Sequence, residues 1–320
     1  MSDNIRKKVW LIGPGLMGIE YAKVLRALNI DFEVIGRSEK SAKKFTEITS
    51  VNVHKGGLQE FLTSKPDLPT NAIVAVNVEA LAETTLLLLK YGIKNILVEK
   101  PAGLNLEEIT LLAQETLKQK AEVYVAYNRR FYAATLEAEK IIKEDGGVTS
   151  FIFEFTEWSH QIVNLDKDPR VKQEWFLANS THVVDLAFHL GGYPIELNCY
   201  TAGKLSWHPI ASIFTGSGKT DKKALFSYHA NWAAPGRWSV EILTNKHRLI
   251  FRPMEKLQIQ KIGSVAIEEV PIDYTLDTNF KHGFYRQVEA FLMGKDKEKL
   301  ESIISHQKMT KEIYSKIVRP

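Results

Sequence analysis

Cysteine is almost absent from this chain, which has a single one, Cys199, among 320 residues. One cysteine excludes an internal disulfide framework and fits a reducing compartment. No cysteine and histidine spacing matches a structural zinc site, so the sequence predicts no metal.

Long apolar runs and blocks of one charge are also missing. No run is long enough to span a membrane, and the first residues lead into a strand without the apolar core of a signal peptide. The 42 basic and 38 acidic residues are dispersed and give a net charge of +4, without the basic block that indicates a nucleic-acid footprint. We expect a cytoplasmic protein that binds neither nucleic acid nor membrane.

The first part of the chain alternates short apolar runs with helical patterns. Runs at 8–13, 32–36, 72–76, 95–99 and 122–127 predict strands, separated by helices such as 16–28, 79–91 and 106–120. This alternation predicts a parallel sheet with helices on both faces. With 44% hydrophobic residues and 320 positions, we expect a second domain as well.

After residue 130 the pattern changes. A helix at 131–144, a strand from residue 150 and an apolar helix around His182 precede alternating segments at 224–232, 237–243, 248–251, 256–262 and 265–270. Turn signals near their junctions predict an antiparallel meander, and helices at 281–293 and 298–316 end the chain. An open antiparallel sheet with one uncovered face favours a homodimer or homotetramer.

The segment "LIGPGLMG" places Gly13, Gly15 and Gly18 directly after a strand and at the start of a helix. This spacing allows a tight turn, a close approach of a pyrophosphate to the backbone, and close packing of helix on strand. The helix start offers free N–H groups to the anion. The segment predicts a dinucleotide site; the alternative is a glycine-rich turn without a ligand.

The end of the second strand bears on the choice of cofactor. An NAD site places Asp or Glu there, whereas this chain has Arg37 and Ser38, which suit a 2′-phosphate. The alternative is that Arg37 is solvated and Glu39 binds the ribose. The sequence favours NADP(H) and leaves NAD(H) open.

Lys100 follows a buried strand in "ILVEKPAG". Ligands of a doubly wound sheet bind beyond the carboxyl ends of its strands, so we expect this ammonium in the active cleft. Pro101 biases Lys100 toward an extended conformation, in a cis or a trans bond. There Lys100 would stabilise a developing alkoxide while hydride moves to or from nicotinamide. The alternative is that it caps the strand end or pairs with Glu99.

A polar stripe crosses the helix around His182. At 100° per residue, His182, Asp185 and His189 fall within about 60° of one another on an otherwise apolar helix. Histidine suits proton transfer near neutrality, and Asp185 could orient it, so we expect His182 to be the general acid/base. The alternatives are a structural hydrogen-bond network and a metal site formed by all three side chains.

Four segments resemble one family of sugar oxidoreductases. "GPGLMG", "VEKPAG", "YNRRF" and "HVVDLAFHLGGYP" are similar to the glucose-fructose oxidoreductase / inositol dehydrogenase / MocA family, over nearly the whole chain. The resemblance implies an α/β fold with an N-terminal Rossmann domain, expected here at 1–126. It also implies a C-terminal α+β domain with an open, mainly antiparallel sheet, expected at 127–320. The final helices would pack within it or back on the first domain.

The resemblance also implies site residues. It gives Lys100 and His182 the catalytic roles, with Asp185 three residues after the histidine. Many members carry an aspartate four residues before that histidine, where this chain has Ala178, so Asn179 would take over substrate positioning or activity would be altered. The expected cofactor contacts are Gly13, Pro14, Gly15, Leu16, Met17, Gly18, Arg37, Ser38, Val76, Asn77, Glu99, Lys100 and Asn128.

Other residues have weaker claims. Arg129 and its neighbour Arg130 would bind a substrate anion or form structural ion pairs, and Trp158 and Trp175 would face a sugar ring or pack in the core. "GSGKT" at 216–220 lacks the glycine spacing and following helix of a phosphate loop, so it predicts an exposed hairpin turn.

These observations predict an NAD(P)-dependent oxidoreductase that acts on a sugar, cyclitol or nucleotide-sugar carbonyl/alcohol pair. Reduction of a non-sugar carbonyl or imine is a variant of the same activity. The alternative from another class is a non-catalytic dinucleotide sensor, which the alanine at position 178 favours.

Overall fold

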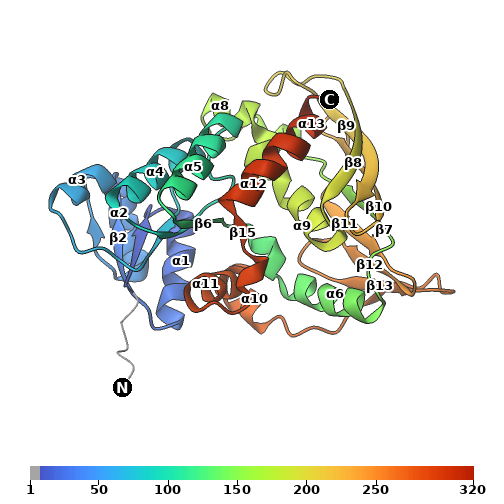
Figure 1. Cartoon of the computed structure of the whole chain (residues 1–320), viewed down its shortest axis with the longest axis horizontal. Coiled ribbons are helices and arrows are strands. Elements are labelled where there is room, and N and C mark those ends of the chain that lie inside the picture. Colours follow the sequence, from blue (N-terminus) through green and yellow to red (C-terminus); the bar gives the residue numbers. More distant parts are fainter. Residues whose placement is uncertain (1–7) are drawn as a thin grey trace. The chain divides into compact units, whose positions relative to one another are not determined.

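The computed structural model describes residues 8–320 and contains two compact units (Figure 1). The first unit contains the described residues up to Tyr127 together with Asp277–Gln307. The second contains Asn128–Leu276 and Lys308–Pro320. Each unit is therefore built from separate stretches of the chain, and the segment Asp277–Gln307, which includes a late helix, joins the first.

The first unit is built on a seven-stranded sheet with the order β15-β6-β5-β4-β1-β2-β3. All neighbouring pairs are parallel except β15, which runs antiparallel to β6. The doubly wound parallel sheet predicted from the sequence is confirmed. The strand order reverses between β1 and β4, and such a reversal creates the crevice where ligands of these sheets bind. The strands are β1 (Lys8–Ile12), β2 (Asp31–Ile35), β3 (Val53–His54), β4 (Asn71–Val74), β5 (Asn95–Val98), β6 (Glu122–Val125) and β15 (Glu301–Ser302).

The helices of this unit begin and end where the sequence provides caps. Ser38 caps α2 by accepting a hydrogen bond from the backbone N–H of Ser41, and Asn105 caps α5 in the same way through Glu108. Gly92 ends α4 in the left-handed conformation, at φ +111°, which glycine adopts without strain. The helices are α1 (Leu16–Ala27), α2 (Glu39–Thr49), α3 (Leu58–Thr63), α4 (Leu81–Tyr91), α5 (Leu106–Lys118) and α11 (Phe284–Met293).

The second unit is built on an eight-stranded sheet with the order β14-β13-β12-β11-β7-β10-β9-β8. Only β7 and β10 are parallel, so the open, mainly antiparallel sheet predicted from the sequence is confirmed. The strands are β7 (Ser150–Glu154), β8 (Pro194–Ala202), β9 (Ile213–Thr220), β10 (Leu225–Asn231), β11 (Ser239–Leu243), β12 (His247–Phe251), β13 (Gln258–Lys261) and β14 (Glu268–Glu269).

Helix α9 (Thr181–Gly191) packs on β7 and β11 of this sheet. Phe188 of α9 makes edge-to-face contacts with Phe151 and Phe226 at centroid distances of 5.9 and 5.1 Å. Gly191 is required at this packing surface, because a Cβ there would lie 2.2 Å from the Phe151 ring. The remaining helices are α6 (Ala133–Glu144), α7 (Ser159–Ile162), α8 (Pro169–Gln173), α13 (Ser315–Val318), and α10 (Thr275–Asn279) and α12 (Ile303–Met309), which each cross from one unit to the other.

The opposite face of the second sheet is exposed within the chain. Ile152 on β7 and Leu225 on β10 alternate with buried neighbours and are 40% and 60% exposed, and Tyr200 on β8 is 69% exposed. This face is the one that the sequence pattern predicted to be open.

The prediction of a turn at residues 216–220 is wrong, because these residues lie inside β9. Gly216 and Gly218 are needed there for close strand packing and not for a turn. A Cβ on Gly218 would lie 1.9 Å from the backbone oxygen of Glu196 and 2.8 Å from the Phe226 ring. A Cβ on Gly216 would meet the Tyr228 ring at 2.5 Å.

The end of the chain also differs from the prediction. The helix expected at 298–316 is preceded by the short edge strand β15, and its middle is a π-helical turn at Thr310–Tyr314 between α12 and α13. Of the strand expected at 265–270, only β14 forms. These elements are too short to give a readable period in the sequence.

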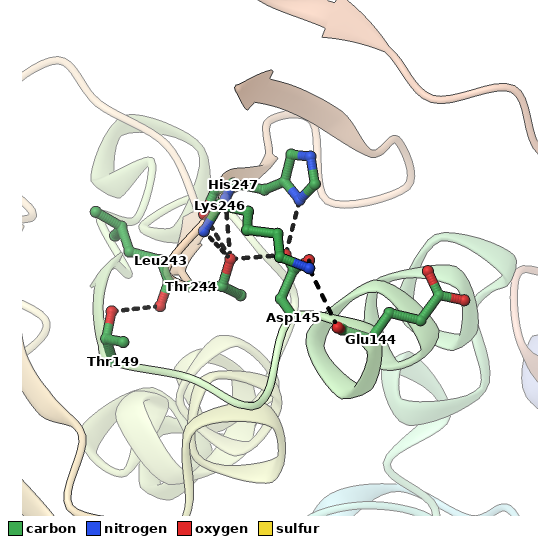
Figure 2. A network of polar contacts seen from close by, with 7 residues as sticks. All are labelled: Glu144, Asp145, Thr149, Leu243, Thr244, Lys246 and His247. Atoms are coloured by element: carbon green, nitrogen blue, oxygen red, sulfur yellow. Dashed lines mark hydrogen bonds and ion pairs between the residues drawn. The ribbon is translucent and has the colours of Figure 1, made fainter. Parts of the chain in front are cut away.

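A buried carboxylate attaches the turn between β11 and β12 to the end of α6 (Figure 2). Asp145 accepts hydrogen bonds from His247 Nδ1 and Thr244 Oγ1, both at 2.7 Å, and Lys246 lies 3.6 Å away. Burial alone raises the pKa of Asp145, but the hydrogen bonds from His247 and Thr244 outweigh it and lower that pKa. The donors converge on one carboxylate, so the cluster is a structural connection.

Candidate functional site

The glycine loop after β1 has the geometry of a dinucleotide turn. Gly13 has φ +109°, and a Cβ there would lie 2.5 Å from the backbone oxygen of Ala75 on the neighbouring strand. A Cβ on Gly18 would lie 2.1 Å from the oxygen of Gly13, so this glycine allows α1 to pack on the turn. Gly15 has open space where a Cβ would lie. It is the N-cap residue of α1, and no side chain accepts hydrogen bonds from the first turn of the helix there. The loop therefore leaves backbone N–H groups accessible to an anion.

A cavity of about 410 Å³ lies beside this loop, within the first unit. It is formed at the carboxyl ends of β1, β2 and β4, where the strand order reverses, and its volume is typical of ligand sites. Several residues predicted to contact the cofactor line it together: Gly13, Pro14, Gly15, Arg37, Ser38, Val76 and Asn77. Glu79, Glu83 and Ser41 line it as well. No sequence pattern indicated these three residues, because each lies a few residues beyond the strand end or helix cap that marks the site.

The end of β2 presents Arg37 and Ser38 to this cavity. Ser38 caps α2, so the N–H groups of the first turn of that helix lie at the same edge. Glu39 is occupied elsewhere: its exposed carboxylate forms an ion pair with Lys55 at 2.7 Å, which lowers its pKa. The cavity edge at β2 is therefore cationic.

The segment that follows β5 holds Lys100 at the same end of the parallel sheet. The Lys100–Pro101 peptide bond is cis, and the carbonyl of Pro101 accepts a hydrogen bond from His306 at 3.0 Å. Glu99 accepts a hydrogen bond from the Tyr21 hydroxyl of α1 at 2.7 Å. Burial raises the pKa of Glu99, although the Tyr21 hydrogen bond and the Lys100 charge oppose this. The His306 contact holds the backbone after Lys100, and the Glu99 N–H holds the backbone before it by donating to the Val74 carbonyl at 2.9 Å.

Three other residues of the predicted cofactor set have different surroundings. Leu16 is 73% exposed, and Met17 contacts Lys281 through its sulfur at 3.0 Å. Asn128 is buried in the second unit, at the start of the 3₁₀ turn Asn128–Phe131.

The polar stripe of α9 reaches several elements of the second unit. Asp185 is buried and accepts two hydrogen bonds from Arg130, Nε to Oδ2 at 2.9 Å and Nη2 to Oδ1 at 2.5 Å. His189 lies 2.7 Å from Glu139 of α6, and burial lowers the pKa of His189. Breaking a buried ion pair such as Arg130–Asp185 from one side typically costs about 3–5 kcal/mol. Asp185 and His189 thus fix the helix that carries His182.

The His182 ring is partly exposed and lies 6.3 Å from the ring of Trp238, in the segment before β11. Of the stripe residues His182, Asp185 and His189, the two histidines are partly accessible while Asp185 is buried. Asp185 contacts Arg130 and His189 contacts Glu139, whereas His182 lies beside Trp238.

The carboxylate of Glu157, which no sequence pattern indicated, holds the turn before α9. Phe176–Ser180 forms a π-helical turn, and Glu157 accepts hydrogen bonds from the Asn179 amide at 3.0 Å and from Ser180 Oγ at 2.7 Å. Burial raises the pKa of Glu157, and these hydrogen bonds oppose the change. Asn179, expected to position substrate, is thus itself held in place. Glu157 gave no signal because its partners lie over twenty residues away in sequence.

The remaining predicted substrate residues have contrasting environments in the second unit. Trp175 is 7% exposed and packs edge-to-face against Trp207 at 6.2 Å, as a core residue. Trp158 is 40% exposed and lies under the guanidinium of Arg237. Arg129 lies over the ring of Trp238. In the part of the chain that the structure describes, no group of histidine, cysteine, aspartate and glutamate side chains could hold a metal, and no helix is long and apolar enough to cross a membrane.

Comparisons with known proteins agree with this geometry. Residues 7–127 match the model of a family described as an oxidoreductase family with an NAD-binding Rossmann fold. A levoglucosan dehydrogenase in complex with NADH and levoglucosan superposes with a TM-score of 0.75 at 19% identity, over 97% of this chain and 96% of that chain. A UDP-N-acetylglucosamine 3-dehydrogenase from Acidithiobacillus ferrooxidans gives a TM-score of 0.73 at 13% identity, over 97% and 96%.

An oxidoreductase from Agrobacterium radiobacter in complex with NAD+, L-tartaric acid and magnesium gives a TM-score of 0.77 at 13% identity, over 98% and 97%. At such identities these likenesses establish a shared fold. No curated protein matches the sequence.

Proposed function

We propose that this chain, whose residues 7–127 match the model of an oxidoreductase family with an NAD-binding Rossmann fold, transfers hydride between a nicotinamide cofactor and a sugar, cyclitol or nucleotide-sugar carbonyl/alcohol pair. The observation that carries the proposal is the cavity at the strand-order reversal, with its glycine loop and with Lys100 at the same end of the sheet. The sugar dehydrogenases among the proteins of the same fold support a polyhydroxylated substrate.

The residues around the cavity fit a dinucleotide. Gly15 leaves room for a pyrophosphate close to the backbone, and the first turn of α1 supplies N–H donors to it. When bound, the cofactor supplies the nicotinamide carbon that accepts or gives up hydride. The protein's own residues bind the cofactor, orient the substrate and transfer one proton.

Two side chains carry the chemistry in this proposal. The Lys100 ammonium donates a hydrogen bond to the reacting substrate oxygen and stabilises its negative charge as hydride moves. His182 takes the hydroxyl proton in the oxidative direction and returns it in reduction. Asp185 acts indirectly, because its ion pair with Arg130 fixes the helix of His182.

We propose that the enzyme prefers NADP(H), the cofactor whose adenosine ribose carries a 2′-phosphate. Arg37, Ser38 and the start of α2 form a cationic cavity edge suited to a 2′-phosphate, while Glu39 is paired with Lys55. NAD(H) binding by the carboxylates of Glu79 and Glu83 is the competing arrangement at the same cavity.

Substitution Arg37→Ala tests this preference. Losing a charge-assisted hydrogen bond to the 2′-phosphate is expected to raise the Kd of NADPH by roughly 10–100-fold, while the Kd of NADH changes by less than about threefold. Fluorescence titration of both cofactors measures the effect, and Arg26→Ala, at an exposed position in α1, is the control. Equal losses for NADPH and NADH would contradict the preference.

A non-catalytic dinucleotide sensor is the second candidate. The buried Ala178, where many relatives have an aspartate, favours it. Both candidates bind the cofactor, and they differ in whether replacing Lys100 changes any turnover.

We propose that copies of the chain associate through the exposed face of the second sheet. Ile152 and Leu225 on the adjacent strands β7 and β10, and Tyr200 on the edge strand β8, place exposed apolar side chains on it, and such area is often buried in an interface. Light scattering at micromolar concentration is expected to give a dimer or tetramer for the wild type and a smaller species for Leu225→Lys. A monomeric wild type would refute this assembly.

A further inference from the structure

Two arginines alternate with three aromatic rings in the second unit. The Arg237 guanidinium lies over the rings of Trp158 and Trp238, at 4.4 and 4.5 Å from their centroids. Arg129 lies over Trp238 at 4.9 Å and over Tyr132 at 5.8 Å. We call this series, Trp158, Arg237, Trp238, Arg129 and Tyr132, the arginine ladder.

The topology of the sheet brings the ladder together. Strands β7 and β10 are parallel and β11 lies on the other side of β7, so the loop from β10 to β11 crosses the end of β7. The chain leaving β7 carries Trp158, whose indole donates a hydrogen bond to the carbonyl of Gly236 in that loop at 3.0 Å. Gly236 permits the crossing, because a Cβ there would lie 2.8 Å from the Thr156 side chain.

The ladder has more positive than negative charge. Arg129 makes no ion pair or side-chain hydrogen bond within the described residues, and its Nε is buried. Arg237 forms one ion pair within the described residues, a long one with Glu157 at 3.9 Å. That carboxylate already accepts hydrogen bonds from Asn179 and Ser180. Stacking on a ring stabilises a guanidinium but does not neutralise its charge.

The two guanidinium groups thus form only one ion pair within the described residues, the long contact of Arg237 with Glu157. The fork of N–H donors on a guanidinium matches a carboxylate, and the aromatic faces hold both guanidinium planes in place. Arg237 and Trp158 are 44% and 40% exposed, so this end of the ladder is accessible to a ligand.

The ladder also adjoins the residue proposed to move the substrate proton. The ring of Trp238, its central member, lies 6.3 Å from the ring of His182. A ligand bound through Arg129 or Arg237 would therefore lie next to the proposed acid/base.

We propose that the arginine ladder binds the carboxylate of the substrate, and that the substrate is a sugar acid or polyol acid. Arg129 makes no ion pair within the described residues, and one carboxylate balances its single charge, whereas a phosphate dianion exceeds it. This inference rests on the proposed oxidoreductase function and narrows its substrate class.

Matched pairs of acid and neutral compounds test the inference. D-Glucuronate and D-glucose, D-galacturonate and D-galactose, and D-gluconate and sorbitol are compared by calorimetric binding to the cofactor-loaded protein and by cofactor turnover. D-Glucose 6-phosphate serves as the phosphate arm. We expect at least one acid to bind and react better than its neutral partner by at least about tenfold, and better than the phosphate.

Variants of the ladder separate binding of the carboxylate from folding. Arg129→Gln is expected to weaken the preferred acid by roughly 10–100-fold, as for the loss of a charge-assisted hydrogen bond, with cofactor binding unchanged. Arg129→Lys is expected to restore part of the loss, and Arg170→Gln, at an exposed arginine paired with Asp168, is expected to change nothing.

The outcomes distinguish this inference from the function it rests on. Neutral sugars that bind and react as well as the acids, with Arg129→Gln affecting both alike, would overturn the ladder and leave the oxidoreductase intact. Preference for the phosphate, or no binding of any acid, would also overturn it. Acid binding that depends on Arg129 without turnover of any compound would support the ladder and count against the oxidoreductase.

Discussion

Replacing Lys100 with methionine is expected to lower kcat/KM for the substrate by about 10²–10⁴-fold and to leave the Kd of the cofactor within about twofold. This loss in rate is the one expected when a preorganised hydrogen-bond donor to a developing oxyanion is removed. It extends to higher values because this donor also carries a charge. The backbone on both sides of Lys100 is held by hydrogen bonds from the Glu99 N–H to Val74 and from His306 to Pro101, so removing the ammonium should not move the loop. Steady-state kinetics with fluorescence titration of the cofactor measures both quantities.

The control for Lys100 is Lys90→Met, which removes an exposed ammonium from the last turn of α4. It should retain full turnover. If Lys100→Met also retained full turnover with every substrate, the lysine would have no catalytic role, and the dinucleotide sensor would become the better interpretation of the fold.

Replacing His182 with glutamine is expected to lower kcat by about 10²–10⁴-fold, the usual contribution of general acid–base catalysis. Glutamine keeps hydrogen-bonding capacity and similar size but cannot carry the proton. The pH profile of the wild type should therefore contain a step that the variant lacks. Stopped-flow measurement of cofactor oxidation in single turnovers would separate this chemical step from product release.

His189→Gln is the matched control, since it lies two turns along the same helix. His189 lies beside Glu139 of α6, so its replacement should lower the free energy of unfolding by about 1 kcal/mol while kcat stays within about twofold. Equal loss of kcat in both variants would indicate that the histidines act only by supporting α9.

Much of the first unit could be predicted from the sequence because its signals are local. A strand, a glycine turn and a helix start lie within a dozen residues around Gly15, and the pattern repeats along the sheet. The same reasoning failed at β9. Glycine usually indicates a turn, and nothing local shows that Gly216 and Gly218 face the rings of Tyr228 and Phe226.

The candidate site in the second unit could be predicted only in part, and for a similar reason. Periodicity correctly placed His182, Asp185 and His189 on one helix, but it could not show which element each would meet. Asp185 meets Arg130, fifty-five residues earlier, and Glu157 meets Asn179. Such pairings depend on tertiary contacts between residues distant in sequence, and no spacing rule describes them.

We propose that the Lys100 ammonium and a His182 ring nitrogen both contact one substrate oxygen at a bound nicotinamide. A crystal structure of the enzyme with NADP+ and its substrate would show whether they do. We expect both side-chain nitrogens within about 3.2 Å of the same substrate oxygen, with the reacting carbon facing the nicotinamide. A bound substrate whose oxygen contacts neither nitrogen, or a dinucleotide seated away from the glycine loop, would contradict it.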